Sequence, residues 1–145
     1  MRERARPRPR RATARIALVL ALGACGPPDG PQPIAWDREA CAHCRMLISD
    51  PAFAAQLHLV DGGVESFDDP GCLLARLDAQ QTRVHALWFR HLREDRWLPG
   101  EGVAFVRVAP TPMDFGLGAV DPGTAGAISL AAARAELRAR RGGAP

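Results

Sequence analysis

The chain has 145 residues, of which 47% are hydrophobic and 24% are charged. This length and balance are typical of one soluble globular domain that buries roughly two-thirds of its unfolded surface. Seven arginines and one glutamate precede the first apolar run, and the remaining chain carries 12 basic and 15 acidic side chains. The basic isoelectric point therefore does not indicate a nucleic-acid-binding protein.

Residues 1–25 have the pattern of a secretory signal. An arginine-rich start precedes the apolar run 16–22, which is too short to span a bilayer but fits the hydrophobic region of a signal peptide. The run ends in LGAC, which resembles the lipobox of bacterial lipoproteins, so Cys25 is expected to be lipidated and to become the mature N-terminus. An ordinary cleaved signal with a chance cysteine is the alternative. We expect a lipid-anchored protein of the cell envelope that faces the periplasm, and Gly26 slightly favours the outer membrane over the inner.

The rest of the chain divides into a tether, a domain and a tail. Residues 26–35 are rich in proline and glycine and are predicted to hold the folded part away from the lipid as a stiff tether. The domain is expected over residues 36–141, in halves of about 36–81 and 82–141. Residues 142–145 are expected to be a disordered tail.

The first half of the domain predicts two strands and a helix. A strand over 53–60 and another over 64–67 flank the sequence DGG, which is a hairpin turn signal. The sequence DDPG at 68–71 predicts a helix start, with an acidic cap and a proline in the first turn. This helix is expected to end near residue 80.

The second half predicts the same order of elements. Strands are expected over 84–91, 97–98, 103–108 and 115–120, and a second DPG sequence precedes a helix over about 124–141. The recurrence predicts an α+β fold of two similar strand-strand-helix units, with helices packed on small antiparallel sheets. Chance recurrence of two DPG helix starts is the alternative.

The sequence CAHCRM at residues 41–46 is the main candidate site. It combines thiols, a thioether and an imidazole, and such soft ligands select Cu(I) over hard cations. Cys44 and Met46 are two residues apart and can face one ion from a turning loop. Cys41 completes a C-x-x-C spacing, which also serves zinc sites, redox pairs and disulfides, and His43 is either a ligand or solvated.

The remaining sulfur residues leave several interpretations open. An oxidising export compartment permits disulfides, but lipidation of Cys25 leaves three other cysteines, so at least one thiol stays free or binds something. Cys72 is interpreted as a small buried hydrophobe on the predicted helix. Met113 follows Pro112 in a rigid turn, which makes it a candidate ligand as well as a candidate core residue. The sequence has no catalytic triad, phosphate loop or HExxH pattern, and an enzyme is not expected.

Four blocks of the chain, in this order, resemble the NosL family of copper-binding lipoproteins. They are CAHCRMLISD at 41–50, FAAQ at 53–56, FDDPGCLL at 67–74 and TPM at 111–113. The resemblance implies a fold related to organomercurial lyase, with duplicated ββα units. It also implies a role in assembling the copper centres of nitrous oxide reductase.

By the same resemblance, Cys44 and Met46 are the principal Cu(I) ligands, Met113 is the third, and Cys41 or His43 is accessory. The implied function is that of a membrane-tethered Cu(I) metallochaperone, which is not an enzyme. Its implied partners are a copper enzyme (nitrous oxide reductase or another cuproenzyme), a copper exporter or donor protein, and the membrane through the lipid anchor. Two alternatives stay open: an interaction lipoprotein with a zinc or disulfide knuckle, and a thiol–disulfide protein that uses the C-x-x-C pair.

One position departs from the family pattern. Many members closest to the denitrification role have glycine between the second cysteine and the methionine, and this chain has Arg45. Because a bulky side chain disfavours a positive φ, the loop is expected to differ from theirs, and the client protein with it.

Overall fold

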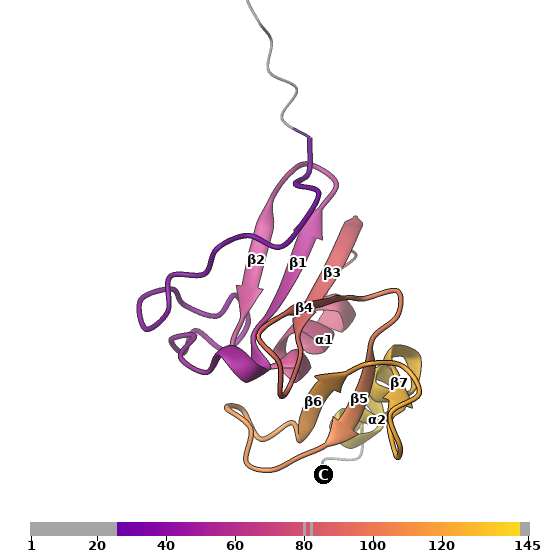
Figure 1. The fold of residues 1–145 in the computed structure, drawn as a ribbon. Helices are drawn as coiled ribbons and strands as arrows, with labels where there is room; N and C mark the ends of the chain where they lie inside the picture. Colours follow the sequence, from indigo (N-terminus) through magenta and orange to yellow (C-terminus); the bar gives the residue numbers. More distant parts are fainter. Residues whose placement is uncertain (1–25, 80, 82, 143–145) are drawn as a thin grey trace, which may run out of the picture.

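The computed structural model describes residues 26–79, 81 and 83–142 (Figure 1). The signal peptide predicted for residues 1–25, with its Cys25, and residues 143–145 of the predicted tail lie outside the described residues. Within the described part, no helix is long and apolar enough to cross a membrane. Two small antiparallel sheets and two helices make up the fold, which confirms the predicted α+β class.

The first sheet has the strand order β2-β1-β3-β4, and all its neighbouring strands are antiparallel. The predicted hairpin is present as β1 and β2. In its turn, Leu59 N donates to Gly63 O, and Gly62 adopts a φ of 91°, which glycine allows without strain. The strands are β1 (Ala55–Leu59), β2 (Val64–Phe67), β3 (Val84–Arg90) and β4 (Trp97–Pro99).

Helix α1 (Pro70–Ala79) starts where the DDPG sequence predicts a helix start. The Asp69 carboxylate accepts a hydrogen bond from Gly71 N at 2.8 Å, and a proline occupies the first turn. A short 3-10 helix, η1 (Pro51–Phe53), is capped in the same way by Asp50 and leads into β1. Local capping by aspartate therefore fixes the chain just before the first hairpin and at the start of the helix that follows it.

The second sheet has the strand order β6-β5-β7 and is followed by helix α2 (Leu130–Gly142). The last residue of α2, Gly142, is the first residue of the predicted tail. The three strands are β5 (Ala104–Arg107), β6 (Leu117–Val120) and β7 (Ile128–Ser129).

The prediction that the second helix starts near residue 124 is wrong. Gly123 and Gly126 adopt positive φ angles of 83° and 74°, which interrupt a helix, and residues 128–129 pair with β5 instead. The Ser129 hydroxyl then accepts a hydrogen bond from Ala132 N at 3.2 Å and caps α2. The second DPG sequence makes a turn rather than a helix start.

The boundary predicted near residue 82 does not separate the two sheets. Strands β3 and β4 follow that boundary in the sequence, yet they belong to the first sheet. A hairpin followed by a helix occurs over both 55–79 and 104–142. The sheets meet where His91 bridges to Ala119 and where Phe89 and Phe105 pack edge to face, with ring centroids 5.1 Å apart.

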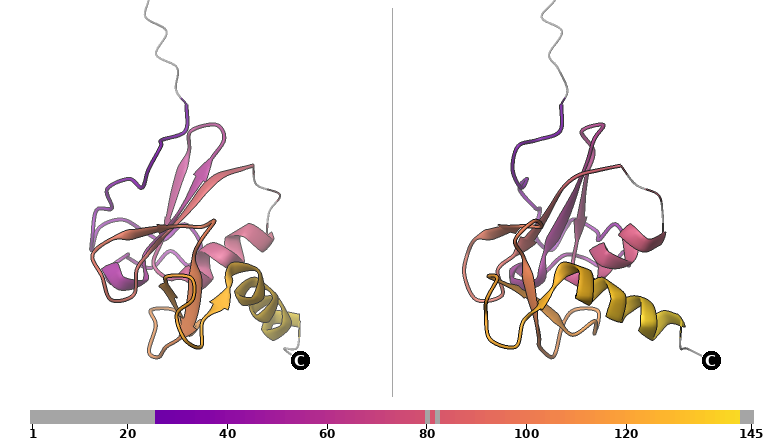
Figure 2. Two further views of the ribbon diagram at one scale, coloured as in Figure 1. Left: turned by 45° about the vertical axis from the view of Figure 1, so that its right-hand side comes forward. Right: turned by 90° about the vertical axis from the view of Figure 1, so that its right-hand side faces the viewer.

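Residues 28–32, predicted as part of the tether, lie against the face of the first sheet that is turned away from α1 (Figures 1 and 2). Gln56 Nε2 donates to Gln32 O at 2.9 Å, and Gln56 Oε1 accepts from Gln32 N at 2.8 Å. His58 Nδ1 lies 3.4 Å from Pro28 O. Because Gln56 and His58 are fully buried, the folded part begins at Pro28 rather than near residue 36.

Candidate metal centre

Three cysteine side chains converge between β2 and α1. The Sγ atoms of Cys41, Cys44 and Cys72 all lie within 4.8 Å of one another, and all three are free thiols. Cys41 and Cys72 are fully buried, whereas Cys44 is half-buried. The cluster joins the 41–46 loop to the first turns of α1.

The 41–46 loop is closed by backbone hydrogen bonds. Cys41 N donates to Met46 O at 2.8 Å, and Arg45 N donates to Cys41 O at 3.1 Å. Ala42 N donates to Ser66 O at 2.9 Å, which fastens the loop to the free edge of β2. The loop is therefore a rigid platform that holds two sulfur atoms.

Arg45 has a φ of 68°, in the left-handed region. A bulky side chain disfavours this region, yet Arg45 adopts it. The surrounding hydrogen bonds override the residue's own preference, which costs about 1–2 kcal/mol for a residue with a Cβ. The Arg45 side chain itself is exposed.

The protons of the cluster are distributed unequally. Hydrogen bonding from the Cys72 thiol, together with the backbone N–H groups of Asp68, Cys44 and His43, lowers the pKa of Cys41 to about 4, although burial opposes this shift. The pKa of Cys72 is raised, first because its proton is shared with Cys41 and then by burial. Burial also raises the pKa of Cys44. Cys41 is therefore the cysteine of the cluster that loses its proton most readily.

The predicted third ligand, Met113, is brought to the start of α1 from the second half of the chain. Met113 N donates to Asp69 Oδ2 at 3.1 Å, while the other oxygen of that carboxylate caps α1. Just beyond Met113, Phe115 packs so closely on Gly71 that a Cβ at position 71 would lie 2.0 Å from the Phe115 ring. Asp69 thus ties the backbone of Met113 to the start of α1, about one helical turn before Cys72.

The structure places the other predicted ligands at the surface of the same region. Met46 is 58% exposed beside the cluster, and His43 is exposed in the same loop. Cys41 and Cys44, both predicted, lie together. Cys25 lies outside the described residues.

Cys72 is the member of the cluster that sequence reasoning assigned to the core instead. Its burial is confirmed, but it also completes the sulfur triangle. The available signals were the odd number of cysteines left after lipidation and the position of Cys72 just after a helix start. Neither signal reveals that the 41–46 loop folds back onto that helix.

A second cluster, formed by His91, Glu94 and Asp121, has the residue types of a metal site but not the right proton arrangement. His91 Nδ1 accepts hydrogen bonds from Arg93 N and Glu94 N at 3.2 and 3.1 Å, so the neutral ring carries its proton on Nε2, the nitrogen that faces the two carboxylates. Arg96 binds both carboxylates as well. A metal-ligating histidine usually donates from its outer nitrogen, so this cluster is an ion-pair network.

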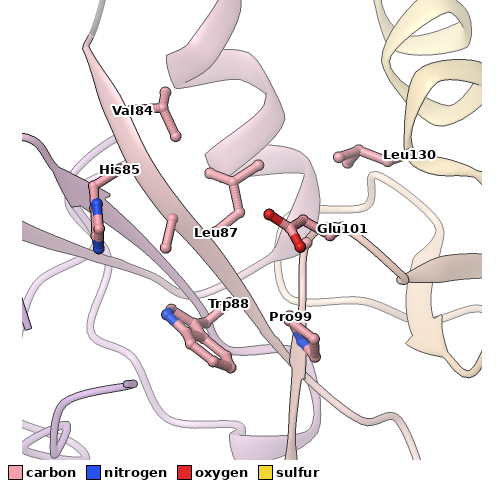
Figure 3. Close-up of a pocket in the computed structure, with 9 residues that line it drawn as sticks. Val84, His85, Leu87, Trp88, Pro99, Glu101 and Leu130 are labelled. Atoms are coloured by element: carbon pink, nitrogen blue, oxygen red, sulfur yellow. The ribbon is translucent and has the colours of Figure 1, made fainter. Parts of the chain in front are cut away.

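A cavity of about 480 Å³ lies along β3, away from the cysteine cluster. It is lined also by the turn after β4 and by Leu130 of α2 (Figure 3). Trp88 and His85 border it, and the buried Trp88 Nε1 has no hydrogen-bond partner. None of the predicted metal ligands lines this cavity. Its walls offer no group of converging reactive side chains, so the candidate site remains the cysteine cluster.

Comparisons with protein-family models, with curated proteins and with solved structures give no match to this chain. The class of the protein is therefore defined by its own structure. It is a small α+β domain with a buried three-thiol cluster that could hold a metal ion.

Proposed function

We propose that this protein binds Cu(I) at the cluster of Cys41, Cys44 and Cys72 and passes it to a partner protein. The observation that supports the proposal is the convergence of three sulfur atoms within 4.8 Å of one another. A metal–thiolate bond of about 2.3 Å, as at zinc–cysteine sites, places three trigonal ligands about 4 Å apart, so one ion needs only a small contraction of the cluster. Soft sulfur donors favour Cu(I) over harder ions.

The cluster has a fixed side and an accessible side, as a carrier requires. Cys41 and Cys72 are fully buried and held by the loop and by α1. Cys44 is half-buried, and the exposed thioether of Met46 and the exposed side chain of Leu47 follow it. In this proposal a partner's ligands approach beside Cys44 and replace the protein's sulfur atoms one at a time.

Methionine side chains could add ligands that release no proton when they bind the metal ion. A thioether carries no proton, so Met46 and Met113 would bind Cu(I) at pH values where thiols stay protonated. Met46 is the accessible candidate because its side chain is exposed, and Met113 is the positioned candidate because Asp69 holds its backbone.

The cellular role proposed here rests on the resemblance to NosL lipoproteins and on the lipobox. The chain would be anchored through Cys25 in the cell envelope and would face the periplasm. It would take Cu(I) from an exporter or donor protein and deliver it to nitrous oxide reductase or to another copper enzyme.

A structural zinc site is the second candidate, and one observation favours it. His43 lies in the same loop as Cys41 and Cys44, and three cysteines with one histidine form a common structural zinc site, although the exposed His43 ring is not part of the converging group and would have to turn toward it. Zinc has little use for methionine. Metal content after purification under anaerobic conditions, together with the effect of the methionine variants, separates the two metals.

The deciding experiment is an anaerobic Cu(I) titration in competition with a chelator. Cys44→Ser and Cys72→Ser should each weaken binding by more than about 100-fold, because even residues that only support metal ligands cost 10–100-fold. Met46→Leu should weaken it less. Cys25→Ser, which removes the anchor but no sulfur of the cluster, is the matched control and should bind as the parent does.

Unchanged affinity in both Cys44→Ser and Cys72→Ser would refute the proposed site. If His43→Ala loses metal affinity while Met46→Leu and Met113→Leu keep it, the site has the ligand set of a zinc site rather than of a Cu(I) site. Copper delivery in cells that survives Cys41→Ser would exclude a function based on a Cys41–Cys44 disulfide, and it would also remove Cys41 from the proposed ligand set.

A further inference from the structure

The chain enters the domain beside the tip of the β1–β2 hairpin (Figure 2). Pro28 O lies 3.4 Å from the ring of His58, and His58 pairs with Val64 next to the hairpin turn. The start of β3 lies at the same end of the sheet, because Val60 N donates to Arg83 O. We call this region, residues 26–28, 60–63 and 83–84, the hairpin end.

The described chain leaves little slack between this end and the predicted lipid. Pro28 is placed against His58 and Gln32 is clasped by Gln56, so Gly26 and Pro27 alone separate the anchored chain from Cys25. Three residues span at most about 11 Å when fully extended. If Cys25 is lipidated, on which this inference rests as part of the proposed function, Pro28 stays within about that distance of the bilayer surface.

The hairpin end also presents two exposed valines. The well-exposed large hydrophobic side chains of the described residues form two pairs, and Val60 (40%) and Val84 (41%) are the pair at this end. The backbone of Val60 is joined to that of Arg83, and the guanidinium of Arg83 is exposed. Asp29 and Asp61 are exposed nearby, so the local charge is mixed and burial of the two valines, rather than charge, favours contact with lipid.

The other exposed pair, Met46 and Leu47, lies at the opposite end of β2, beside the cysteine cluster. We call the 41–47 loop, residues 68–72 and Met113 the cysteine end. From Gly63 to Asp68 the chain runs along β2, which at about 3.3 Å per residue sets the two ends about 17 Å apart.

We propose that the hairpin end rests on the surface of the lipid bilayer and that the cysteine end points away from it. The short linker fixes which end meets the lipid, and Val60 and Val84 make the contact. In this seating the half-buried Cys44 and the exposed Met46 face the periplasm, where a protein partner reaches them. A long flexible tether would allow every orientation, whereas this linker allows few.

The test uses the lipidated full chain in nanodiscs of phosphatidylethanolamine and phosphatidylglycerol that contain a gadolinium-bearing lipid. Amide NMR signals of Val60, Gly62 and Val84 should be broadened, and those of Ala42 and Met46 should not. A long Gly-Ser insertion between Gly26 and Pro27 should abolish the difference between the two ends.

Paired substitutions test the contact itself. The double variant Val60→Asp, Val84→Asp should show weaker broadening at residues 60–62 and 84 than the parent, while the chain still floats with the discs on the same short linker. Leu47→Asp, which places the same charge on an equally exposed residue of the cysteine end, should leave the broadening pattern unchanged.

Equal broadening of both ends in the parent protein would overturn the seating and leave the lipid anchor standing. Broadening confined to the cysteine end would overturn it as well. A chain that does not float with the discs would refute the anchor and the seating together, and anaerobic Cu(I) titration of the same sample would still report on metal binding separately.

Discussion

The cysteine end and the hairpin end of this protein are built in opposite ways. At the cysteine end, a closed loop, a capped helix and a turn from the second half of the chain meet around three cysteines, two of them fully buried. At the hairpin end there are a glycine turn and two exposed valines, the incoming chain contacts His58, and the Gln56 side chain binds it farther along at Gln32. A site for a soft metal ion requires side chains that are positioned in advance. A surface that contacts the bilayer requires only a short linker to the lipid and some exposed apolar side chains.

Copper binding should produce the largest difference between the two ends, measured as the change in hydrogen-exchange protection. At free Cu(I) about 1,000-fold above the dissociation constant, binding to the folded state alone adds about 4 kcal/mol of stability. Hydrogen exchange followed residue by residue should show added protection in loop 41–46 and around Cys72, and much less at residues 60–63. Added protection of equal size at the hairpin turn would show that the two ends are a single cooperative unit and would break the comparison.

Gly71→Ala should lower the free energy of unfolding more than any other single change proposed at the cysteine end. The new Cβ would meet the Phe115 ring at 2.0 Å, and overpacking of this kind costs about 1–3 kcal/mol. Urea denaturation should show the loss, and Cu(I) affinity should fall because the start of α1 shifts. Gly102→Ala is the matched control, since nothing lies within 4 Å of the added atom. Similar denaturation midpoints for both variants would contradict the close packing of the 113–116 turn on α1.

Gln56→Leu should release residues 28–32 from the first sheet while Ser66 O still accepts from Ala42 N and holds the 41–46 loop. The change keeps the buried volume but removes both hydrogen bonds to Gln32 and the contacts of Gln56 with the buried Ser66 Oγ and His58 Nε2, at a cost of about 1–3 kcal/mol. Limited proteolysis within residues 26–33 should accelerate while anaerobic Cu(I) affinity stays at the parental value. A weakened affinity would show that the clasp supports the cluster across the sheet.

Asp78→Asn tests the contact between the helices, which belongs to neither end. Hydrogen bonds from Arg138 and then Arg134 lower the pKa of Asp78 below its ordinary value of 3.8. A carboxylate with a depressed pKa stabilises the fold above its unfolded-state pKa, and that contribution is lost as the pH falls through the depressed value.

The variant should therefore lose about 0.5–1 kcal/mol at neutral pH, a small figure because Arg138 is largely exposed. The difference from the parent should vanish in acid below the depressed pKa. Denaturation curves of both proteins at the two pH values measure this, and a difference that persisted in acid would assign the effect to packing instead of charge.

Local chemistry predicted the elements of this fold better than their assembly. The DGG turn and the Asp69 cap depend on neighbouring residues, and both were predictable. The start of α2 was not, because Thr124 lies in a segment where β5 recruits residues 128–129 as a strand. The tether prediction missed the contacts of residues 28–32 for the same reason, since Gln56 lies far along the chain.

The candidate site shows the same limit. Cys41 and Cys44 lie in one loop, and their spacing alone indicated a joint role. Cys72 looked like an ordinary core residue, because only tertiary folding places α1 beneath that loop. Met113 is joined to the start of α1 by a hydrogen bond from its backbone N to Asp69 Oδ2. The two residues are far apart in the sequence, so no local pattern predicts this contact.

Arg45→Gly gives the smallest expected effect and tests a conflict between a residue and its backbone. Glycine removes about 1–2 kcal/mol of left-handed strain but adds about 0.5–1 kcal/mol of chain entropy to the unfolded state. The net result should be a gain of about 0.5 kcal/mol in the free energy of unfolding, with Cu(I) affinity unchanged because the side chain is exposed. Asp37 has a similar φ of 59°, but aspartate tolerates that region better, so Asp37→Gly should bring no gain. If Arg45→Gly instead weakened Cu(I) binding, the arginine would be holding the loop rigid for the metal, and its strain would be part of the site.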